Sequence, residues 1–288
     1  MKKKYFSILE NLEEGKASVA SPNDKVLIID GLNTFIRSFA VSPVTNDDGI
    51  HVGGITGFLM SIGFAIKTLQ PTRVIVCFDG KGGSQRRRKI YPDYKANRLV
   101  RTKLNRTNAF SDKDSEDQNM KMQLGRLVQY LDNLPVQILA PQNIEADDAI
   151  AYISKQLLID SKIFIMSSDK DFIQLQKFNN VKQFSPIQKK FVKDDNPRTY
   201  LFNHIMKGDT GDGIPNVLSA DDTFVTDKTQ SPLRKTRIAE WLENSDNLRE
   251  VMDDEIYRNY QRNKKLIDLT EVPEPIQQNI INNYNEQK

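Results

Sequence analysis

The 288-residue chain has a single cysteine, Cys77, and only two histidines, His51 and His204. One cysteine cannot form an internal disulfide framework or supply the several thiolates of a structural zinc site. Two histidines far apart in the sequence do not indicate a Ser–His or Cys–His nucleophilic centre. We therefore expect Cys77 to lie in the core and both histidines to be structural or at the surface. Any hydrolytic chemistry would depend on carboxylates, lysines or metals held by oxygen.

Long apolar runs are also absent. No stretch approaches the ~20 apolar residues that span a bilayer, and the basic start "MKKKYFSILENLEEGK" contains no apolar signal-peptide core. We expect an intracellular protein without membrane attachment. The hydrophobic share of 38% and the charged share of 27% are typical of a globular chain, and the length suits one large domain or two modest ones.

Net charge is small, at +3, but it is unevenly distributed. Residues 81–106 contain ten Lys or Arg and a single acid, Asp93, which leaves the remainder of the chain mildly acidic. Such a run is often a solvated surface or a localisation signal. Here it directly follows Asp79, and it interleaves Tyr91 and Tyr94 with the cations. Aromatic rings can stack on unpaired bases while cations hold phosphates, so the segment predicts a polyanion-binding surface.

Three short β-rich apolar runs, 25–30, 73–79 and 162–169, lack the alternation of a half-exposed strand and predict strands buried on both faces. Helical patterns at 54–69, at 120–134 and from 146 separate them. This strand–helix alternation predicts an α/β fold with a mostly parallel sheet flanked by helices. Residues 107–119 are polar and predict a mobile loop, and from about 232 the chain reads as helices.

Carboxylates follow the three predicted strands at Asp30, Asp79 and Asp169. An acid after one strand commonly caps a helix, but parallel strands bring their carboxyl ends to one edge, where α/β proteins place their sites. Further acids occur in "IEADDAIA", "SSDKDF" and "GDTGDG": Glu145, Asp147, Asp148, Asp171, Asp209 and Asp212. The last motif is not an EF-hand, because the sixth and twelfth positions from Asp209 are Ile214 and Ala220.

Converging carboxylates raise one another's pKa unless cations neutralise them. Oxygen ligands without cysteine or histidine select Mg²⁺ or Mn²⁺. Two such ions about 4 Å apart can activate water and stabilise the leaving oxygen of a phosphodiester. The acids and the basic segment together predict phosphoryl hydrolysis on nucleic acid.

The basic segment has two local interpretations. If it is helical, the i, i+4, i+7, i+11 spacing places Arg87, Tyr91, Tyr94 and Arg98 on one face. Pro92 opposes a continuous helix.

Four motifs in order resemble those of the 5′-nuclease (flap endonuclease) superfamily, and most of all the ribonuclease H (5′→3′ exonuclease) group of T-even-type bacteriophages. They are "LIIDGLNTFIRS", "VCFDGKGGSQRRRKIYPDYKANR", "IEADDAIA" with "MSSDKDFIQL", and "GDTGDGIPNV". The resemblance implies a PIN-like catalytic domain at 25–185 with a basic helical arch at about 81–122. It also implies an N-terminal extension at 1–24 and a C-terminal helical, helix-hairpin-helix-like subdomain at 186–288 that binds duplex.

The resemblance also implies residue roles. A first metal ion would be held by Asp30, Asp79, Glu145, Asp147 or Asp148, and Asp169, and a second by Asp171, Asp209 and Asp212. Arg87 and Lys95 would contact the scissile phosphate, and Tyr94 would stack near the 5′ nucleotide. The other nucleic-acid contacts would come from Arg86, Arg88, Arg98 and the backbone at Gly211 and Gly213. The implied cofactors are two Mg²⁺ or Mn²⁺ ions.

The implied activity is 5′→3′ exonuclease, flap endonuclease and RNase H cleavage, which removes primers during lagging-strand replication. A monomer would act on a 5′ flap, a nicked duplex or an RNA–DNA hybrid, with a single-strand-binding protein and a sliding clamp as family partners. A phage-encoded enzyme would work in the cytoplasm of a bacterial host.

Other classes fit less well or stay open. A PIN-type ribonuclease would use similar acids, but it usually lacks the long basic insertion and the C-terminal helices. A non-catalytic DNA-binding replication accessory could keep the fold. A HAD-type phosphatase needs D-x-D after its first strand, and Leu32 stands where the second Asp would be.

Overall fold

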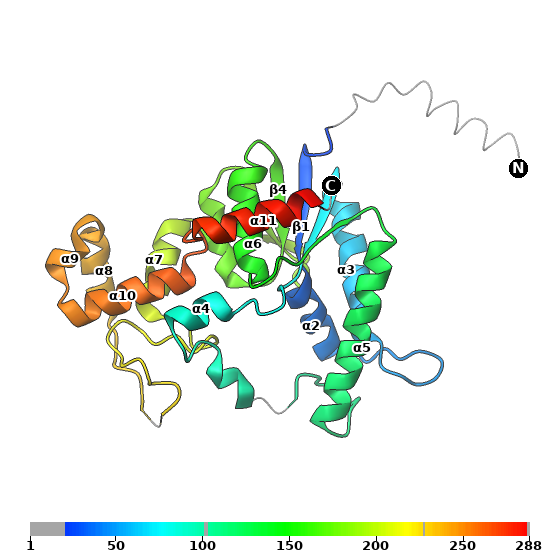
Figure 1. The fold of residues 1–288 in the computed structure, drawn as a ribbon, viewed down its shortest axis with the longest axis horizontal. Coiled ribbons are helices and arrows are strands. Elements are labelled where there is room, and N and C mark those ends of the chain that lie inside the picture. Colours follow the sequence, from blue (N-terminus) through cyan, green and yellow to red (C-terminus); the bar gives the residue numbers. More distant parts are fainter. Residues whose placement is uncertain (1–20, 101–102, 227, 287–288) are drawn as a thin grey trace, which may run out of the picture.

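The computed structural model describes residues 21–100, 103–226 and 228–286 (Figure 1). Residues 1–20 of the predicted N-terminal extension therefore lie outside the described residues. A central six-stranded sheet has the strand order β3-β2-β1-β4-β5-β6. The strands are β1 (Lys25–Asp30), β2 (Arg73–Cys77), β3 (Gln137–Leu139), β4 (Lys162–Met166), β5 (Val181–Ser185) and β6 (Lys190–Val192). All pairs are parallel except β5–β6, which confirms the predicted mostly parallel sheet.

Both faces of the sheet are covered by helices, which explains why its strands lack polar alternation. On one face, Leu27 and Ile29 of β1 pack into the cluster formed by α2 (Gly31–Val41), α3 (Gly53–Leu69) and α5 (Lys113–Asp132). On the other, Val26 and Ile28 pack with α6 (Ala146–Tyr152), the π-helical turn η2 (Ile153–Leu157) and α11 (Glu274–Glu286). Cys77 is fully buried in this second cluster, as expected.

Helix α11 lies on the sheet although it is the last helix of the chain (Figure 1). Ile280 and Tyr284 belong to the cluster beneath the sheet, and Arg73 donates a 2.8 Å hydrogen bond to Tyr284 Oη. β6 and α11, which follow the predicted division at residue 185, thus belong to the sheet and to the helices that cover it.

The remaining C-terminal helices form their own core. They are α7 (Pro197–Lys207), α8 (Lys235–Glu243), α9 (Leu248–Val251) and α10 (Asp254–Ile267), with the short turn η4 (Ser245–Asn247) between α8 and α9. Met206, Ile238 and Trp241 are buried between them. Residues 215–226 and 228–234 form turns and irregular segments, and the helices that the sequence predicts from about residue 232 begin with α8.

The basic segment is not one helix. α4 (Gln85–Ile90) ends before Pro92, and a 3₁₀ segment, η1 (Ala96–Val100), follows after a turn. Arg87 and Arg98 therefore do not share a helix face. Helix α5 begins at Lys113, where Asp112 accepts a 2.8 Å hydrogen bond from the Ser115 N–H, so the second half of the predicted 107–119 loop is helical.

Another 3₁₀ segment, η3 (Lys170–Lys177), follows β4 and carries Asp171. In the described part of the chain, no helix is long and apolar enough to cross a membrane.

Candidate active site

A cavity of about 520 Å³ opens at the carboxyl edge of the sheet and gathers most of the acids singled out in the sequence. Parallel pairing of β2, β1 and β4 places Asp30, Asp79 and Asp169 side by side at this edge. Eight of the nine predicted acids line the cavity: Asp30, Asp79, Glu145, Asp147, Asp169, Asp171, Asp209 and Asp212. The ninth, Asp148, does not.

Strand ends and helix starts position the first three acids. Asp30 caps α2 by accepting a 3.2 Å hydrogen bond from the Asn33 N–H, and Ser167 Oγ donates to its other oxygen at 2.9 Å. Asp169 begins η3 and accepts from the Asp171 N–H at 3.1 Å. Asp79 Oδ1 accepts from the Ala146 N–H at 2.8 Å, at the start of α6. Each carboxylate thus satisfies a free N–H of a first turn while facing the cavity.

Asp209 and Asp212 are held by a tight hairpin at 208–214. Asp209 and Ile214 exchange backbone hydrogen bonds of 2.9 and 2.7 Å, and Asp209 Oδ1 accepts from the Asp212 N–H at 3.0 Å. Gly208 has φ of +66°, and a Cβ there would lie 2.2 Å from the Ile214 carbonyl oxygen. Glycine is therefore required for the turn that aims both acids at the cavity.

Arg87 lies beneath the cavity, not on its surface. Its side chain is 2% exposed, and its guanidinium pairs with Glu145, with Asp147 at 3.2 Å and with Asp148 at 3.0 Å. Arg86 adds a bidentate pair to Asp148 at 2.9 Å. The expected contact of Arg87 with a scissile phosphate does not fit this burial, and Asp148 faces two arginines instead of the cavity.

Lys95 is one of four cations that line the acidic cavity. Its Nζ contacts Glu145 and lies 3.9 Å from Asp212 Oδ2. Burial alone would lower the pKa of Lys95, but Asp212 and Glu145 outweigh it and raise the pKa. The residue has φ of +60°, a strained conformation that is uncommon outside glycine and clusters at functional sites. Its N–H donates to the Asp212 carbonyl at 2.8 Å, which ties the basic segment to the hairpin.

The two tyrosines of the basic segment are buried. Tyr94 is 2% exposed, and its hydroxyl donates to Asp212 at 2.8 Å, with Glu145 at 3.1 Å. Tyr91 packs with α7 and α10, and its hydroxyl bonds the Asp221 carbonyl. Neither ring is free to stack on a base, so the stacking expectation for Tyr94 is not supported. Both rings anchor the segment to the C-terminal helices.

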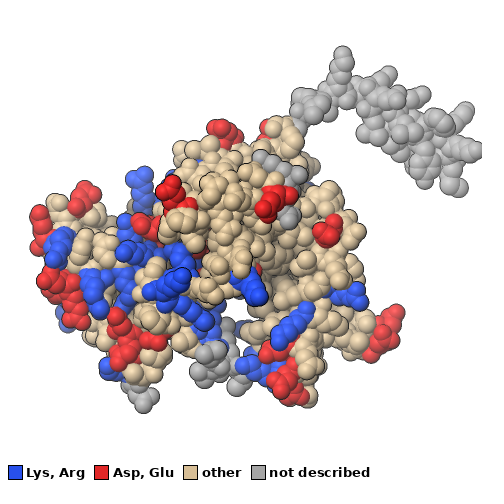
Figure 2. Space-filling view, in the orientation of Figure 1, with Lys and Arg blue, Asp and Glu red and all other residues tan. Residues whose placement is uncertain are grey.

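Further cations surround the cavity. Arg98 pairs with Asp212. The cavity is lined by Arg98 and Gly211, and also by Arg37 of α2 and by Arg106. Figure 2 shows Lys and Arg gathered beside a hollow in this face, over α4 and the neighbouring α10. Arg88 is exposed on α4. Arg37 is a cavity residue that was not predicted from the sequence, although its i+7 spacing from Asp30 is a usable helical signal.

The backbone N–H groups directly after the hairpin already have hydrogen-bond acceptors within the protein. The N–H groups of Asn216, Val217 and Leu218 donate to Gln230, Met206 and Asn216. These three N–H groups are therefore not available as backbone donors to duplex phosphates. Gly213, with φ of +70°, completes the hairpin.

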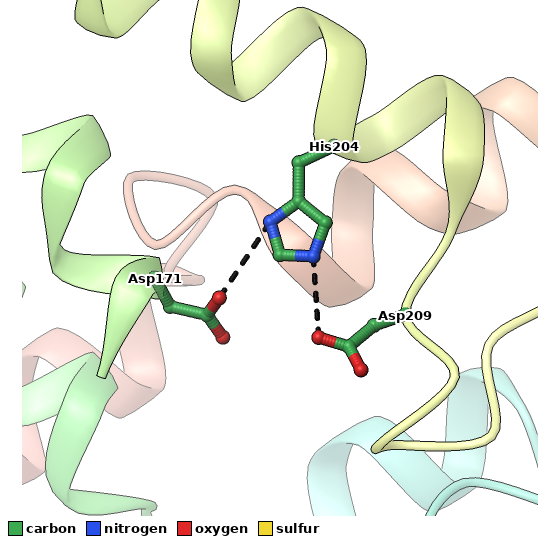
Figure 3. Close-up of side chains that lie close together, drawn as sticks. All are labelled: Asp171, His204 and Asp209. Carbon is green, nitrogen blue, oxygen red and sulfur yellow. Dashed lines mark hydrogen bonds and ion pairs between the residues drawn. The ribbon is translucent and has the colours of Figure 1, made fainter. Parts of the chain in front are cut away.

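His204 is the main residue that the sequence did not predict at the site. It lies on the last turn of α7. Its Nε2 is 3.2 Å from Asp209 Oδ2, and its Nδ1 is 3.6 Å from Asp171 Oδ1 (Figure 3). No spacing rule links it to either acid, so the sequence offered little signal. By contrast, His51 is structural as expected, and is buried against Gln123 and Phe39.

The electrostatics of the cavity fit a divalent cation. Burial, with Asp169 and Asp79 nearby, raises the pKa of Asp30 to about 7, and burial with Asp169 raises that of Asp171 to about 7. Burial would also raise the pKa of Glu145, but Arg87 and Lys95 hold it down to about 2. An oxygen-rich cluster in which Asp30 and Asp171 resist ionisation is the kind of donor set that Mg²⁺ and Mn²⁺ neutralise.

These pKa shifts predict how the stability of the metal-free protein depends on pH. The raised pKa values of Asp30 and Asp171 mean that the fold retains protons which the unfolded chain releases above its pKa of about 4, so stability falls as pH rises toward 7. Burial of His204 would lower its pKa, but the hydrogen bond to Asp209 outweighs this and raises the pKa. The stabilisation that comes from the protonated imidazole is also lost as pH rises. We expect the melting temperature in EDTA to fall between pH 5.5 and pH 8.

Divalent metal should reverse this loss. Mg²⁺ or Mn²⁺ is expected to raise the melting temperature more at pH 8 than at pH 5.5, because the bound cation favours ionised carboxylates. Asp169→Asn should reduce the gain. Thermal melts with EDTA or with each ion test this, and a melting temperature indifferent to both ions at pH 8 would contradict it.

The sheet, the cavity of carboxylates and its cationic rim together have the arrangement of metal-dependent nucleases. The family described as "5'-3' exonuclease, N-terminal resolvase-like domain" matches residues 25–200, and "T4 RNase H, C terminal" matches residues 196–288. The chain belongs to the 5′-3′ exonuclease family. Its region beyond residue 196 is of the T4 RNase H type, which favours this family over a PIN-type ribonuclease.

Individual relatives agree. The chain is 32% identical to a ribonuclease H of Enterobacteria phage T4 over 239 residues, which is 80% of this chain and 76% of that protein. It is 27% identical to a 5'-3' exonuclease of Bacillus subtilis over 53% of this chain and 48% of that protein, so it spans about half the length of that relative. The T5 D15 protein crystallised with metal ions has the same fold, with a TM-score of 0.65 and 18% identity over 91% of this chain and 98% of that one. A T5 D15 flap endonuclease complex with DNA and metal ions gives a TM-score of 0.66 at 19% identity, with the same coverage of both chains.

Proposed function

We propose that this member of the family is a metal-dependent 5′ nuclease that hydrolyses phosphodiesters at the 5′ ends of RNA or DNA annealed to DNA. The observation that carries the proposal is the cavity in which eight carboxylates meet Lys95 and three arginines. A substrate with a phosphate backbone would find cations at the rim and acids at the floor, and hydrolysis at a 5′ end would remove primers or flaps.

The donor set supports two Mg²⁺ or Mn²⁺ ions. Asp30, Asp79, Glu145, Asp147 and Asp169 would hold the first, and Asp171, Asp209 and Asp212 the second. Asp148 is left out of this set because both its arginine partners keep it away from the cavity. When bound, such ions lower the pKa of an attacking water and neutralise charge on the phosphate.

The chain's own cations would bind and orient the phosphate. Lys95 is already drawn into the cavity by Glu145, so a phosphate oxygen could take over part of that interaction without a large movement. Arg98 is 47% exposed and could turn from Asp212 toward the backbone of the substrate. Arg37 and Arg106 line the same cavity.

The segment from α4 to α5 would act as the arch that borders the path of the 5′ strand. Its two sides are tied down differently: Tyr91 and Tyr94 pack against α7 and α10, while Glu116 of α5 accepts the N–H groups of Leu104 and Asn105. The C-terminal helices α7–α10 are the proposed duplex-binding subdomain, and they would leave α11 to the catalytic layer. Single-strand-binding and clamp proteins remain proposed partners.

Cleavage assays test this proposal directly. We expect the wild-type protein to cleave a 5′-flap DNA and a nicked RNA–DNA hybrid with Mg²⁺ or Mn²⁺, but not in EDTA. A 3′-flap duplex should stay intact. Lys95→Ala should slow single-turnover cleavage on the order of 10²-fold, as for removal of one charge-stabilising donor. Lys89→Ala, which changes an exposed residue of α4, should cleave normally.

The wild-type assay and the comparison of the two lysine variants can each refute a part of the proposal. A wild-type protein that binds the flap but never cleaves it would instead be a DNA-binding accessory. If Lys95→Ala cleaves as fast as Lys89→Ala, Lys95 does not stabilise the reacting phosphate.

A further inference from the structure

The imidazole of His204 faces a gap between two carboxylates that come from different elements (Figure 3). Asp171 belongs to η3, and Asp209 opens the hairpin after α7. One oxygen of each acid and one ring nitrogen of His204 all lie within 4.8 Å of one another. Asp171 and Asp209 line the cavity and are proposed to hold the second ion, and His204 beside them adds a nitrogen to this oxygen donor set.

The two ring nitrogens of His204 have different surroundings. Nε2 lies 3.2 Å from Asp209 Oδ2, within hydrogen-bond range. Nδ1 is shielded from solvent and has no hydrogen-bond partner among the described residues, because Asp171 Oδ1 is 3.6 Å away. A shielded nitrogen without a hydrogen bond is costly even in ion-pair range of a carboxylate, so this one needs an explanation.

A cation between Nδ1 and Asp171 accounts for the gap. Two ligand atoms that are each about 2.1 Å from one ion can be up to about 4.2 Å apart, and the observed 3.6 Å falls within this limit. The Nε2–H would then donate to Asp209, which fixes the tautomer that leaves the Nδ1 lone pair free. A metal-bound histidine that donates its other N–H to a carboxylate is a recurrent arrangement that also orients the ring.

We propose that His204 supplies an imidazole nitrogen ligand, through Nδ1, to the second cation site of this chain. The proposal deepens the proposed function, because it rests on the divalent-ion site of that nuclease. An imidazole donor favours borderline ions over Mg²⁺, whereas carboxylates alone suit Mg²⁺ and Mn²⁺ equally well. The second site therefore prefers Mn²⁺, and more strongly Co²⁺ or Zn²⁺, over Mg²⁺. This differs from the all-oxygen site that the sequence predicts.

Pulsed electron paramagnetic resonance of bound Mn²⁺ reads the ligand directly. The wild-type protein with stoichiometric Mn²⁺ should show nuclear modulation from a directly coordinated ¹⁴N, which changes to the ¹⁵N pattern when histidine is ¹⁵N-labelled. His204→Gln should lose the signal. Because His51 is the only other histidine and is packed against Gln123 and Phe39, loss of the signal in this variant identifies His204.

Calorimetric titration measures the effect on selectivity. His204→Gln should weaken Mn²⁺ binding by about 10–100-fold, the usual range for loss of a metal-site partner, and should change Mg²⁺ binding far less. Lys207→Gln is the matched control, since it alters an exposed residue on the same helix turn and should leave both affinities unchanged.

The outcomes separate this proposal from the broader one. Wild-type protein that binds Mn²⁺ without a nitrogen signal would overturn the role of His204 and leave the nuclease proposal standing. The same holds if His204→Gln keeps the signal, or if it weakens Mg²⁺ and Mn²⁺ equally. Wild-type protein that binds no divalent ion would overturn the metal centre itself. The wild-type spectrum is decisive even if the variant fails to fold.

Discussion

Replacing Asp79 by asparagine is expected to reduce Mg²⁺-dependent cleavage by roughly 10³-fold or more while leaving the fold intact. Asp79 is an exposed member of the carboxylate cavity, and removing its charge weakens the cation that neutralises the phosphate. Such stabilisation is worth several kcal/mol, and each 1.36 kcal/mol is a factor of ten in rate. The side-chain amide keeps an oxygen that can still accept from the Ala146 N–H, so the start of α6 should remain capped.

Single-turnover cleavage of a 5′-flap substrate, together with circular dichroism melts, checks both halves of this expectation. Asp132→Asn is a suitable control because it makes the same chemical change at an exposed position at the end of α5, away from the cavity. Undiminished cleavage by Asp79→Asn would refute the assignment of the site. A collapse of its melting temperature would instead show that Asp79 acts mainly as a cap of α6.

The sheet and the position of the site were predictable because both depend on short-range patterns. Apolar runs ending in Asp30, Asp79 and Asp169 identify strands, and parallel pairing then fixes where their ends meet. These three strand-end acids reach one cavity for this reason. The parallel strands inferred from these apolar runs therefore predict the position of the site better than any single motif does.

The environment of the basic segment was less predictable, because burial is a tertiary property. Tyr94 and Arg87 look like substrate contacts in the sequence, yet both are almost fully buried. An arginine among Tyr residues gives the same pattern whether it faces a nucleic acid or three internal carboxylates. Pro92 gave a local clue, since a proline opposes a continuous helix and α4 ends at Ile90, two residues before it.

His204, by contrast, lies at the site although the sequence did not predict it there. Its contact with Asp171 joins α7 to η3, which are separated in the sequence, and a lone histidine five residues before an acid fits no ligand spacing. Only the packing of α7 beside the edge of the sheet creates the donor set. Residues contributed by a second packing unit are therefore the ones most easily missed.

The burial of Arg87 leads to the second large effect. Arg87→Ala should lower the free energy of unfolding by about 3–5 kcal/mol, the usual cost of removing one partner from a buried ion pair. Glu145 and Asp148 would remain buried, and only Arg86 and Lys95 would be left to compensate them. Arg88→Ala, next to it on α4 but exposed, should stay within about 0.5 kcal/mol of the wild type.

Urea unfolding of both variants distinguishes a structural role from a substrate contact. If Arg87 acts through Glu145 and Asp148, its loss should destabilise the protein more at pH 8 than at pH 5, because the unpaired acids can be protonated at the lower pH. If Arg87 instead contacts the substrate, Arg87→Ala would retain the stability of Arg88→Ala and lose only cleavage. The buried guanidinium favours the first result, since a side chain that is 2% exposed cannot reach a phosphate without breaking its ion pairs with three carboxylates.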